Sequence, residues 1–176
     1  CFAPRFERYF LPHAIELGRS FAVRDAGASS LFAMQSLWQG LGRIVAQRKG
    51  VKYLFGKVTI PPTYDAEARR LLLLFLQKFY PAREPLLVAR KVFVPPQGDD
   101  PFSEARYEDN YALLKSLLRC RGERIPPMIH AYMRLSREMQ TFDAMVNHDF
   151  GNAVEAAILL PVDAITPTRR ETYIRL

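Results

Sequence analysis

Cysteine, histidine and long apolar runs are scarce in this sequence. Its 176 residues include two cysteines, Cys1 and Cys120, and three histidines. Two cysteines are too few for a disulfide framework or a cysteine-based metal site, so we expect no metal and a reducing, cytoplasmic location. The longest dense apolar run, Leu71–Leu76, is far shorter than the roughly 18 residues that a membrane-spanning helix needs. No Cys–His or Ser–His arrangement indicates a covalent intermediate.

The composition predicts one folded domain with a basic first third. Hydrophobic residues make up 49% of the chain and charged residues 24%, which is typical of a globular protein. Residues 1–60 hold nine Lys and Arg against three Asp and Glu, and so carry +6 of the net charge of +7. A basic surface attracts acidic proteins, anionic lipid headgroups or nucleic acid. No nucleic-acid-binding motif accompanies the charge, so nucleic acid is not predicted; charge that only favours solubility is the alternative.

Residues 14–60 predict a strand, a helix and a second strand. Ala14–Val23 is rich in apolar and β-compatible residues, which indicates a buried strand. Leu31–Gln47 has apolar residues at the three-and-four spacing of one helix face. Val51–Ile60 again has the composition of a strand. Together they form a β-α-β unit in which a loop leads into the start of a helix.

The helix of this unit has suitable residues at both ends and two glycines inside. Ser29 or Ser30 can cap its start, and Gly50 can end it. Interior glycines cost about 1 kcal/mol each relative to alanine. Gly40 and Gly42 therefore predict close packing of this helix on the sheet.

The loop Arg24–Ser29 has the features of an anion site. Free backbone N–H groups and the helix dipole both favour a negative charge at the start of a helix. Arg24 adds a positive charge, and Gly27 lets the backbone approach a ligand closely. An ordinary start of a helix is the alternative.

Glu16 and Arg19 are the charged residues of a mostly apolar strand. Burying them is costly unless they are paired or used. A regular strand places them on opposite faces, and a β-bulge would bring them to one face. A Glu in a partly desolvated cleft has a raised pKa and suits a general base, while Arg19 can orient Glu16 or hold a substrate carboxylate. A structural ion pair is the alternative.

The rest of the chain predicts further helices and strands. The aromatic, basic segment Phe2–Leu11 suits a short helix with Phe6 and Phe10 packed inward. The elements expected from capping residues, prolines and apolar spacing are a helix from Thr63 or Asp65 to about Tyr80, an edge strand at Leu86–Val94, helices from Glu104 to Cys120 and at Met128–Leu135, and strands at Met139–Val146 and Ala153–Val162.

Separated blocks of the sequence resemble one family in the same order. They are ELGRSF, RDAGAS, LWQGLGR, YLFGKVTI, IPPMIHAYMRLS and NHDFGNAVEAAILLPVD. The chain resembles the bacterial hemolysin-like GNAT N-acyltransferases, which make ornithine lipids and glycine lipids from 3-hydroxyacyl-acyl carrier protein, and it is most similar to the glycine-lipid branch. The Glu-x-x-Arg-x-Phe strand also resembles acyl-homoserine-lactone synthases, which share the fold and the carrier-protein donor.

The resemblance implies an α/β, GNAT-like fold, a mixed β-sheet flanked by helices. We expect a single domain over residues 1–176, with a helical insert at about 82–125. In this fold several strands and a helix pair usually precede the strand that ELGRSF resembles, and here only residues 1–13 do. We therefore expect the N-terminal part of the fold to be missing from this chain.

The implied function is transfer of a 3-hydroxyacyl chain to the amine of glycine or a similar amino acid. Acyl-acyl carrier protein or acyl-CoA is the expected co-substrate, with no permanently bound cofactor. The expected partners are acyl carrier protein, the amino-acid substrate and, through peripheral contact, an anionic inner-membrane surface. The alternatives are an acetyl-CoA-dependent GNAT enzyme acting on a small amine, and a non-catalytic, membrane-active hemolysin-like protein.

The resemblance also assigns roles to individual residues. The catalytic residues are Glu16 as the base, Arg19 beside it, and Tyr64 as the acid that protonates the leaving thiolate. The residues that hold the acyl donor are Arg24, Gly27, Ser29, Phe55 and Lys57. Asp149 binds the acceptor amine, and Tyr132 contacts the acyl chain. Packing, capping or turn formation is the alternative for Tyr64, Tyr132 and Asp149.

Overall fold

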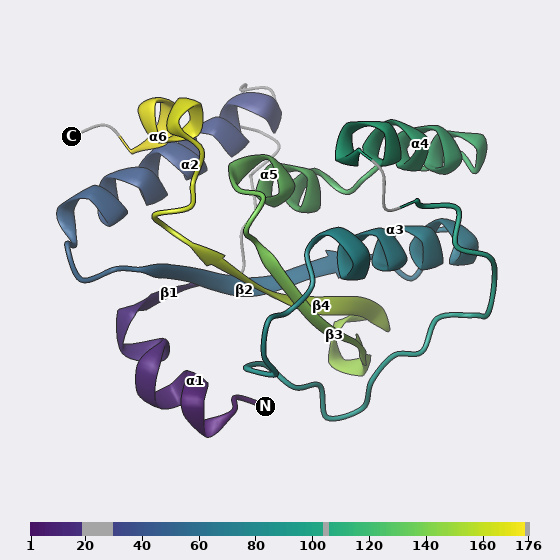
Figure 1. Cartoon of the computed structure of the whole chain (residues 1–176), viewed down its shortest axis with the longest axis horizontal. Coiled ribbons are helices and arrows are strands. Elements are labelled where there is room, and N and C mark those ends of the chain that lie inside the picture. The colour runs from purple at the N-terminus through teal and green to yellow at the C-terminus, as the bar shows by residue number, and fades with distance from the viewer. Residues whose placement is uncertain (19–29, 104–105, 175–176) are drawn as a thin grey trace.

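The computed structural model describes residues 1–18, 30–103 and 106–174, with the backbone alone described at 30–34. Its centre is a four-stranded sheet in the order β1-β2-β4-β3 (Figure 1). The strands are β1 (Ala14–Leu17), β2 (Tyr53–Ile60), β3 (Gln140–Asn147) and β4 (Ala153–Pro161). β1 and β2 are parallel, whereas β4 is antiparallel to both of its neighbours. The predicted α/β fold with a mixed sheet flanked by helices is therefore confirmed, and it is consistent with a GNAT-like fold.

Helix α2 (Ser30–Gln47) joins the two parallel strands. It lies on one side of the sheet with four further helices, whereas α1 (Pro4–Tyr9) and the connection after α3 lie on the other side (Figure 1). The four helices that accompany α2 are α3 (Ala66–Phe79), α4 (Tyr107–Cys120), α5 (Pro127–Leu135) and α6 (Pro167–Tyr173).

The side chains of β2 alternate between two hydrophobic clusters, as successive residues of a strand must. Leu54, Val58 and Ile60 pack into the larger cluster, beneath the five helices. Phe55 packs into a smaller cluster around Phe6 of α1. The sheet therefore has a thickly covered face and a face that only α1 and the connection cover.

Local sequence signals mark the ends of several helices. The carboxylate of Asp65 accepts a hydrogen bond from the backbone N–H of Ala68 (2.8 Å) and so caps α3. Gly122, with φ of 73°, follows the end of α4 in the left-handed conformation that glycine favours. Phe6 is fully buried in α1, as expected.

Two packing predictions were wrong. Leu86–Val94 does not form a strand: Leu87 makes an isolated bridge with Phe2, and Val94 is 79% exposed. Its backbone N–H groups bond to different segments, Val88 to the oxygen of Cys1 (2.9 Å) and Phe93 to that of Ala144 (2.7 Å), so no ladder extends along it. The close contact at Gly42 is with α6 rather than the sheet, because a Cβ atom there would lie 1.7 Å from the backbone oxygen of Tyr173.

Candidate active site

A cavity of about 180 Å³ lies on the thinly covered face of the sheet, against the N-terminal residues and the connection after Leu86. All four strands contribute a charged side chain to its lining. These side chains are Glu16 of β1, Lys57 of β2, Asp143 of β3 and Glu155 of β4. Three carboxylates and one ammonium group are thus brought to one cavity from distant parts of the chain.

Glu155 is the most buried of these charged groups. Its side chain is 8% exposed, and its Oε2 accepts hydrogen bonds from Nζ of Lys57 (2.7 Å) and Nδ2 of Asn147 (2.9 Å). A buried carboxylate needs partners of this kind. Because the side chain of Lys57 is 56% exposed and an ammonium group has three donors, Lys57 can hold a further anion in the cavity.

Glu16 lies opposite Phe55 in the parallel pair β1–β2 and has an exposed side chain. Within the described residues no hydrogen bond or ion pair to its carboxylate is found. A carboxylate that is not committed to a structural partner is free to accept a proton from a bound amine.

Asp143 lies in a β-bulge. The register between β3 and β4 shifts between Thr141 and Ala144, and Asp143 is one of the two residues between them. Bulges redirect side chains near functional sites. A bulge between Glu16 and Arg19 is not tested, because Arg19 lies outside the described residues. The observed bulge is in β3 instead, and its residue Asp143 lines the cavity.

The remaining lining of the cavity is mostly apolar. Phe2, Phe55, Leu87, Met145 and Ala157 contribute to it. Phe55 is 5% exposed and contacts Phe6 edge-on, with 5.2 Å between the ring centroids. The cavity thus combines charged groups on the strands with an apolar wall, as ligand sites usually do.

The structure brings together three of the residues predicted for the site: Glu16, Phe55 and Lys57 all line the cavity. Asp149 is exposed in the short turn His148–Phe150, and the cavity lining does not include it. The predicted positions Arg19, Arg24, Gly27 and Ser29 lie outside the described residues.

Tyr64 lies on the other face of the sheet from the cavity. It belongs to the larger cluster, and its hydroxyl donates a hydrogen bond to the backbone oxygen of Arg124 (3.0 Å). Burial, followed by the nearby charges of Glu123 and Asp65, raises the pKa of Tyr64 above its usual range. A hydroxyl with this pKa holds its proton firmly, and in this position it fixes the start of α3.

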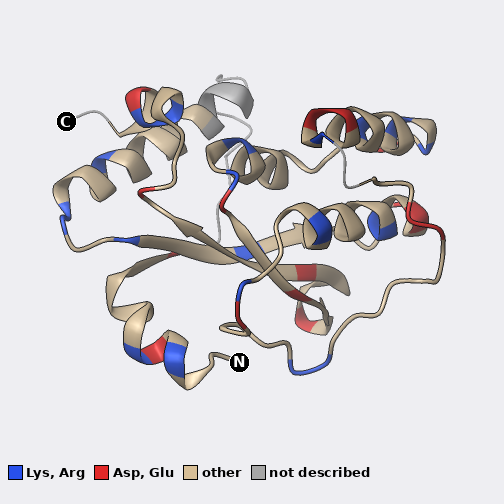
Figure 2. Ribbon diagram, viewed as in Figure 1, with Lys and Arg blue, Asp and Glu red and all other residues tan. Residues whose placement is uncertain are grey.

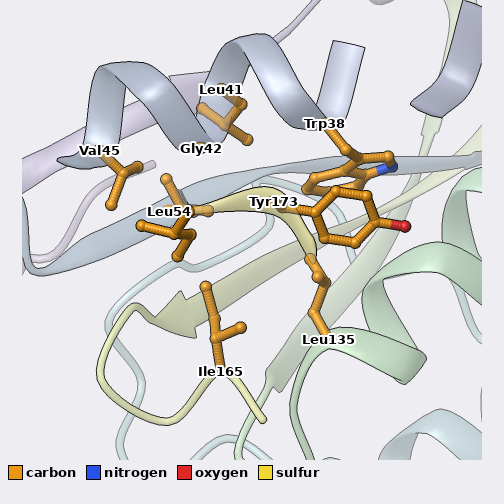
Figure 3. A pocket seen from close by; sticks show the side chains of 9 residues that line it. Trp38, Leu41, Gly42, Val45, Leu54, Leu135, Ile165 and Tyr173 are labelled. Atoms are coloured by element: carbon orange, nitrogen blue, oxygen red, sulfur yellow. The ribbon is translucent and has the colours of Figure 1, made fainter. Parts of the chain in front are cut away.

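Tyr132 is also on the helix-covered side. It is 2% exposed and packs edge-on against Trp38 of α2, with 5.4 Å between the ring centroids. Burial raises the pKa of Tyr132 to about 12. The nearby apolar pocket between α2 and α6, which Trp38 and Tyr173 help to line (Figure 3), has a volume of about 10 Å³. A cavity of that size holds at most one water molecule.

Sequence reasoning missed two of the four charged residues of the cavity, Asp143 and Glu155. Glu155 had a usable signal, because it is the single charged residue in the otherwise apolar strand AVEAAILLP. A lone carboxylate in such a strand must find a partner. Asp143 had no comparable signal, because its place in the cavity depends on the bulge.

No group of three or more His, Cys, Asp or Glu residues is arranged to hold a metal ion in the part of the chain that the structure describes. Among the helices of that same part, none is long and apolar enough to cross a membrane.

The protein is thus an α/β domain, consistent with a GNAT-like fold, with a charged site on its sheet. Two curated proteins are similar to this chain. Glycine N(alpha)-acyltransferase of Bacteroides thetaiotaomicron is 36% identical over 99% of this chain and 54% of its own length. Glycine N(alpha)-acyltransferase of Phocaeicola vulgatus is 34% identical over 98% of this chain and 56% of its own length.

The chain therefore spans about half the length of these relatives. No protein-family model matches the chain. No solved structure matches it either.

Proposed function

We propose that this protein is an N-acyltransferase that moves a 3-hydroxyacyl chain from acyl carrier protein to the amine of glycine, in the synthesis of an aminolipid. The observation that favours this function is the cavity in which all four strands place a charged side chain, with Glu16 and Lys57 among them. The two similar proteins are named for acyl transfer to the α-amine of glycine. The carrier-protein donor and the lipid product come from the resemblance of the sequence blocks.

Free glycine carries an ammonium group and a carboxylate, and the cavity offers groups of both signs. The ammonium group of Lys57 can pair with the glycine carboxylate, because more than half of its side chain is exposed. The carboxylates of Glu16 and Asp143 can hold the glycine ammonium group. Glu155 is engaged by Lys57 and Asn147, and so it positions Lys57 rather than binding substrate.

Transfer then removes two protons from the glycine ammonium group and delivers one to the thiol. Glu16 takes the first proton, and the neutral amine attacks the thioester carbonyl. The carbon–sulfur bond then breaks, and the nitrogen gives its second proton to the departing thiolate as the amide forms. Backbone N–H groups suit the stabilisation of the intermediate oxyanion. The predicted loop Arg24–Ser29 is proposed to hold the phosphate of the donor.

The test is mass spectrometry of lipid extracts from bacterial cells that express the protein, the Glu16→Gln variant or the Glu138→Gln variant. Glu138 is a matched control, since it forms an exposed ion pair with Arg83 and does not line the cavity. We expect N-(3-hydroxyacyl)glycine in cells with the unchanged protein and with Glu138→Gln, and none with Glu16→Gln.

Each other result has a definite meaning. Product from all three forms would exclude Glu16 as the base and keep the reaction. Absence of product from a folded, expressed protein would overturn the lipid-synthase function. An assay of the purified protein with glycine and either acyl carrier protein, acyl-CoA or acetyl-CoA as the acyl donor then separates the donor classes.

A further inference from the structure

A second, larger hollow lies on the helix-covered side of the molecule, between α4 and α5. Its volume is about 390 Å³, within the range of ligand sites. The charged residues that line it are Lys115, Arg119, Glu123 and Arg124, and the aromatic ones are Tyr111 and His130. Figure 2 shows basic residues on α4, the helix from which Lys115 and Arg119 line the hollow. The cavity on the sheet shares no residue with this hollow.

The hollow has a net positive charge, because its three cations outnumber the one carboxylate, Glu123. Within the described residues, Lys115, Arg119 and Arg124 form no ion pair. The one acidic side chain of the lining, Glu123, accepts a hydrogen bond from the backbone N–H of Asp65 (3.0 Å). Three cations around one hollow attract an anion with several negative oxygens, such as a phosphate group.

Aromatic rings form one wall of the hollow. Tyr111 of α4 stacks on His130 of α5, with 6.3 Å between the ring centroids, and Nζ of Lys115 lies 4.8 Å from the centre of the Tyr111 ring. Burial lowers the pKa of His130, and the positive charges of Arg134, Lys115 and Arg169 lower it further. Of these charges, Lys115 also lines the hollow, so the imidazole responds to part of the charge that an anion would meet there.

We propose that this hollow binds the phosphate-bearing end of the acyl donor, as a phosphate subsite separate from the predicted loop Arg24–Ser29. The inference deepens the proposed function and depends on it. The ligand class is an organic phosphate: either the 3′-phosphate monoester of CoA, with the loop holding the pyrophosphate, or the phosphodiester of phosphopantetheine on a carrier protein, which then lies in the hollow in place of the loop.

The position of the hollow suits an elongated donor. The segment that follows β2 is fixed directly to its rim, by the bond from the Tyr64 hydroxyl to the backbone oxygen of Arg124 and by the bond between Asp65 and Glu123. β2 itself carries Phe55 and Lys57 into the cavity on the sheet. The rim of the hollow is thus joined to the C-terminal end of the strand that carries Phe55 and Lys57, and we propose that the donor passes around this end of β2.

The experiment follows His130 by NMR. The protein has three histidines, so the ring signals of His13 and His148 report non-specific effects in the same sample. The pH is titrated alone and with 4′-phosphopantetheine, adenosine 3′,5′-bisphosphate or inorganic phosphate. We expect one of the two organic phosphates to raise the pKa of His130 and to leave the other two histidines unchanged, because a bound anion offsets the neighbouring cations.

Calorimetry of the same ligands tests the residues. The variant Lys115→Ala/Arg119→Ala/Arg124→Ala should weaken binding at least tenfold, and binding to the unchanged protein should weaken as salt is added. The matched control is Arg48→Ala/Lys49→Ala, which removes two exposed cations after the end of α2 and should bind as the unchanged protein does.

Tighter binding of phosphopantetheine supports a carrier-protein donor, and tighter binding of the nucleotide supports CoA. Organic phosphates that bind no better than inorganic phosphate, or that shift all three histidines alike, would overturn the subsite. The titration contains neither glycine nor a thioester. A negative result therefore leaves the transfer reaction standing, and a positive result does not require that reaction.

Discussion

The ammonium group of Lys57 lies 2.7 Å from Oε2 of Glu155 and links β2 to β4 on the face of the sheet that carries the cavity. Asn147 of β3 donates to the same oxygen atom. One buried carboxylate therefore ties three strands together and fixes the position of Lys57.

Glu155→Gln should lower the free energy of unfolding by about 1–2 kcal/mol, because the ammonium group then faces a neutral amide in place of its carboxylate partner. Urea denaturation followed by circular dichroism measures this. Glu138→Gln removes an ion pair whose two side chains are 56% and 67% exposed, and should change the same quantity by less than about 0.5 kcal/mol. If the two variants lose the same free energy of unfolding, the burial of Glu155 does not strengthen its ion pair with Lys57.

Two glycines of α2 should respond oppositely to alanine. At Gly42 a Cβ atom would lie 1.7 Å from the backbone oxygen of Tyr173, so Gly42→Ala should displace α6 and cost about 1–3 kcal/mol. Gly40 has open space around it, and Gly40→Ala should stabilise the protein by about 1 kcal/mol through helix propensity.

The single tryptophan reports on this contact. Trp38 lies 6.2 Å from the Tyr173 ring, centroid to centroid. Gly42→Ala should therefore change the fluorescence of the folded protein, whereas Gly40→Ala should not. An unchanged spectrum and unchanged stability in Gly42→Ala would contradict the close packing of α2 and α6.

Gly56 allows the parallel strands to approach each other beside the cavity. A Cβ atom there would lie 2.5 Å from the backbone oxygen of Leu17, so Gly56→Ala should push β1 away and cost about 1–3 kcal/mol. Because Glu16 is on the displaced strand, acyl transfer should fall as well. Gly50→Ala, at a position with open space, is the control and should leave transfer unchanged. A stable, fully active Gly56→Ala protein would rule out a tight β1–β2 pair.

The stability of the protein should fall as the pH drops below about 6.5, the usual pKa of histidine. Burial and the charges of Arg134, Lys115 and Arg169 lower the pKa of His130 in the folded protein. Between the folded and unfolded pKa values the unfolded chain binds more protons, so acid favours unfolding. The contribution is fully present above the unfolded pKa and is lost as the pH falls through the folded pKa.

Denaturation midpoints measured from pH 7.5 to pH 5 check this dependence. His130→Gln should flatten the curve, and Lys115→Gln should flatten it in part because one of the repelling charges is gone. The same steep curve in His130→Gln would assign the pH dependence to other groups.

Periodicity predicted most elements of this fold to within a few residues. The helix expected at Leu31–Gln47 begins one residue earlier, and the strand expected at Val51–Ile60 begins two residues later. Apolar spacing, prolines and capping residues are local signals, and they act over the same few residues that form each element. Leu86–Val94 misled this reasoning, because its composition suits a strand but its backbone makes separate hydrogen bonds to different segments rather than a continuous ladder.

The cavity could be predicted only in part. Glu16 stood out as a charge on an apolar strand, and Lys57 was assigned through the family resemblance. Both faces of β2 look apolar, however, so the sequence did not tell which face carries Phe55 and Lys57. Pairing decides that question, since β4 lies between β2 and β3 and brings Glu155 to the same side. Residues that are far apart in the sequence and pair across strands cannot be recognised from local patterns.

The place of β2 in the interior of the sheet has a consequence for local opening. Phe55 is flanked by β1 on one side and β4 on the other, so its amide should exchange hydrogen for deuterium only when the sheet as a whole comes apart. The opposite wall of the cavity includes Leu87, Val88 and Ala89, which belong to no strand ladder. The two walls of the cavity should therefore open with very different free energies, the strand side rarely and the connection side often.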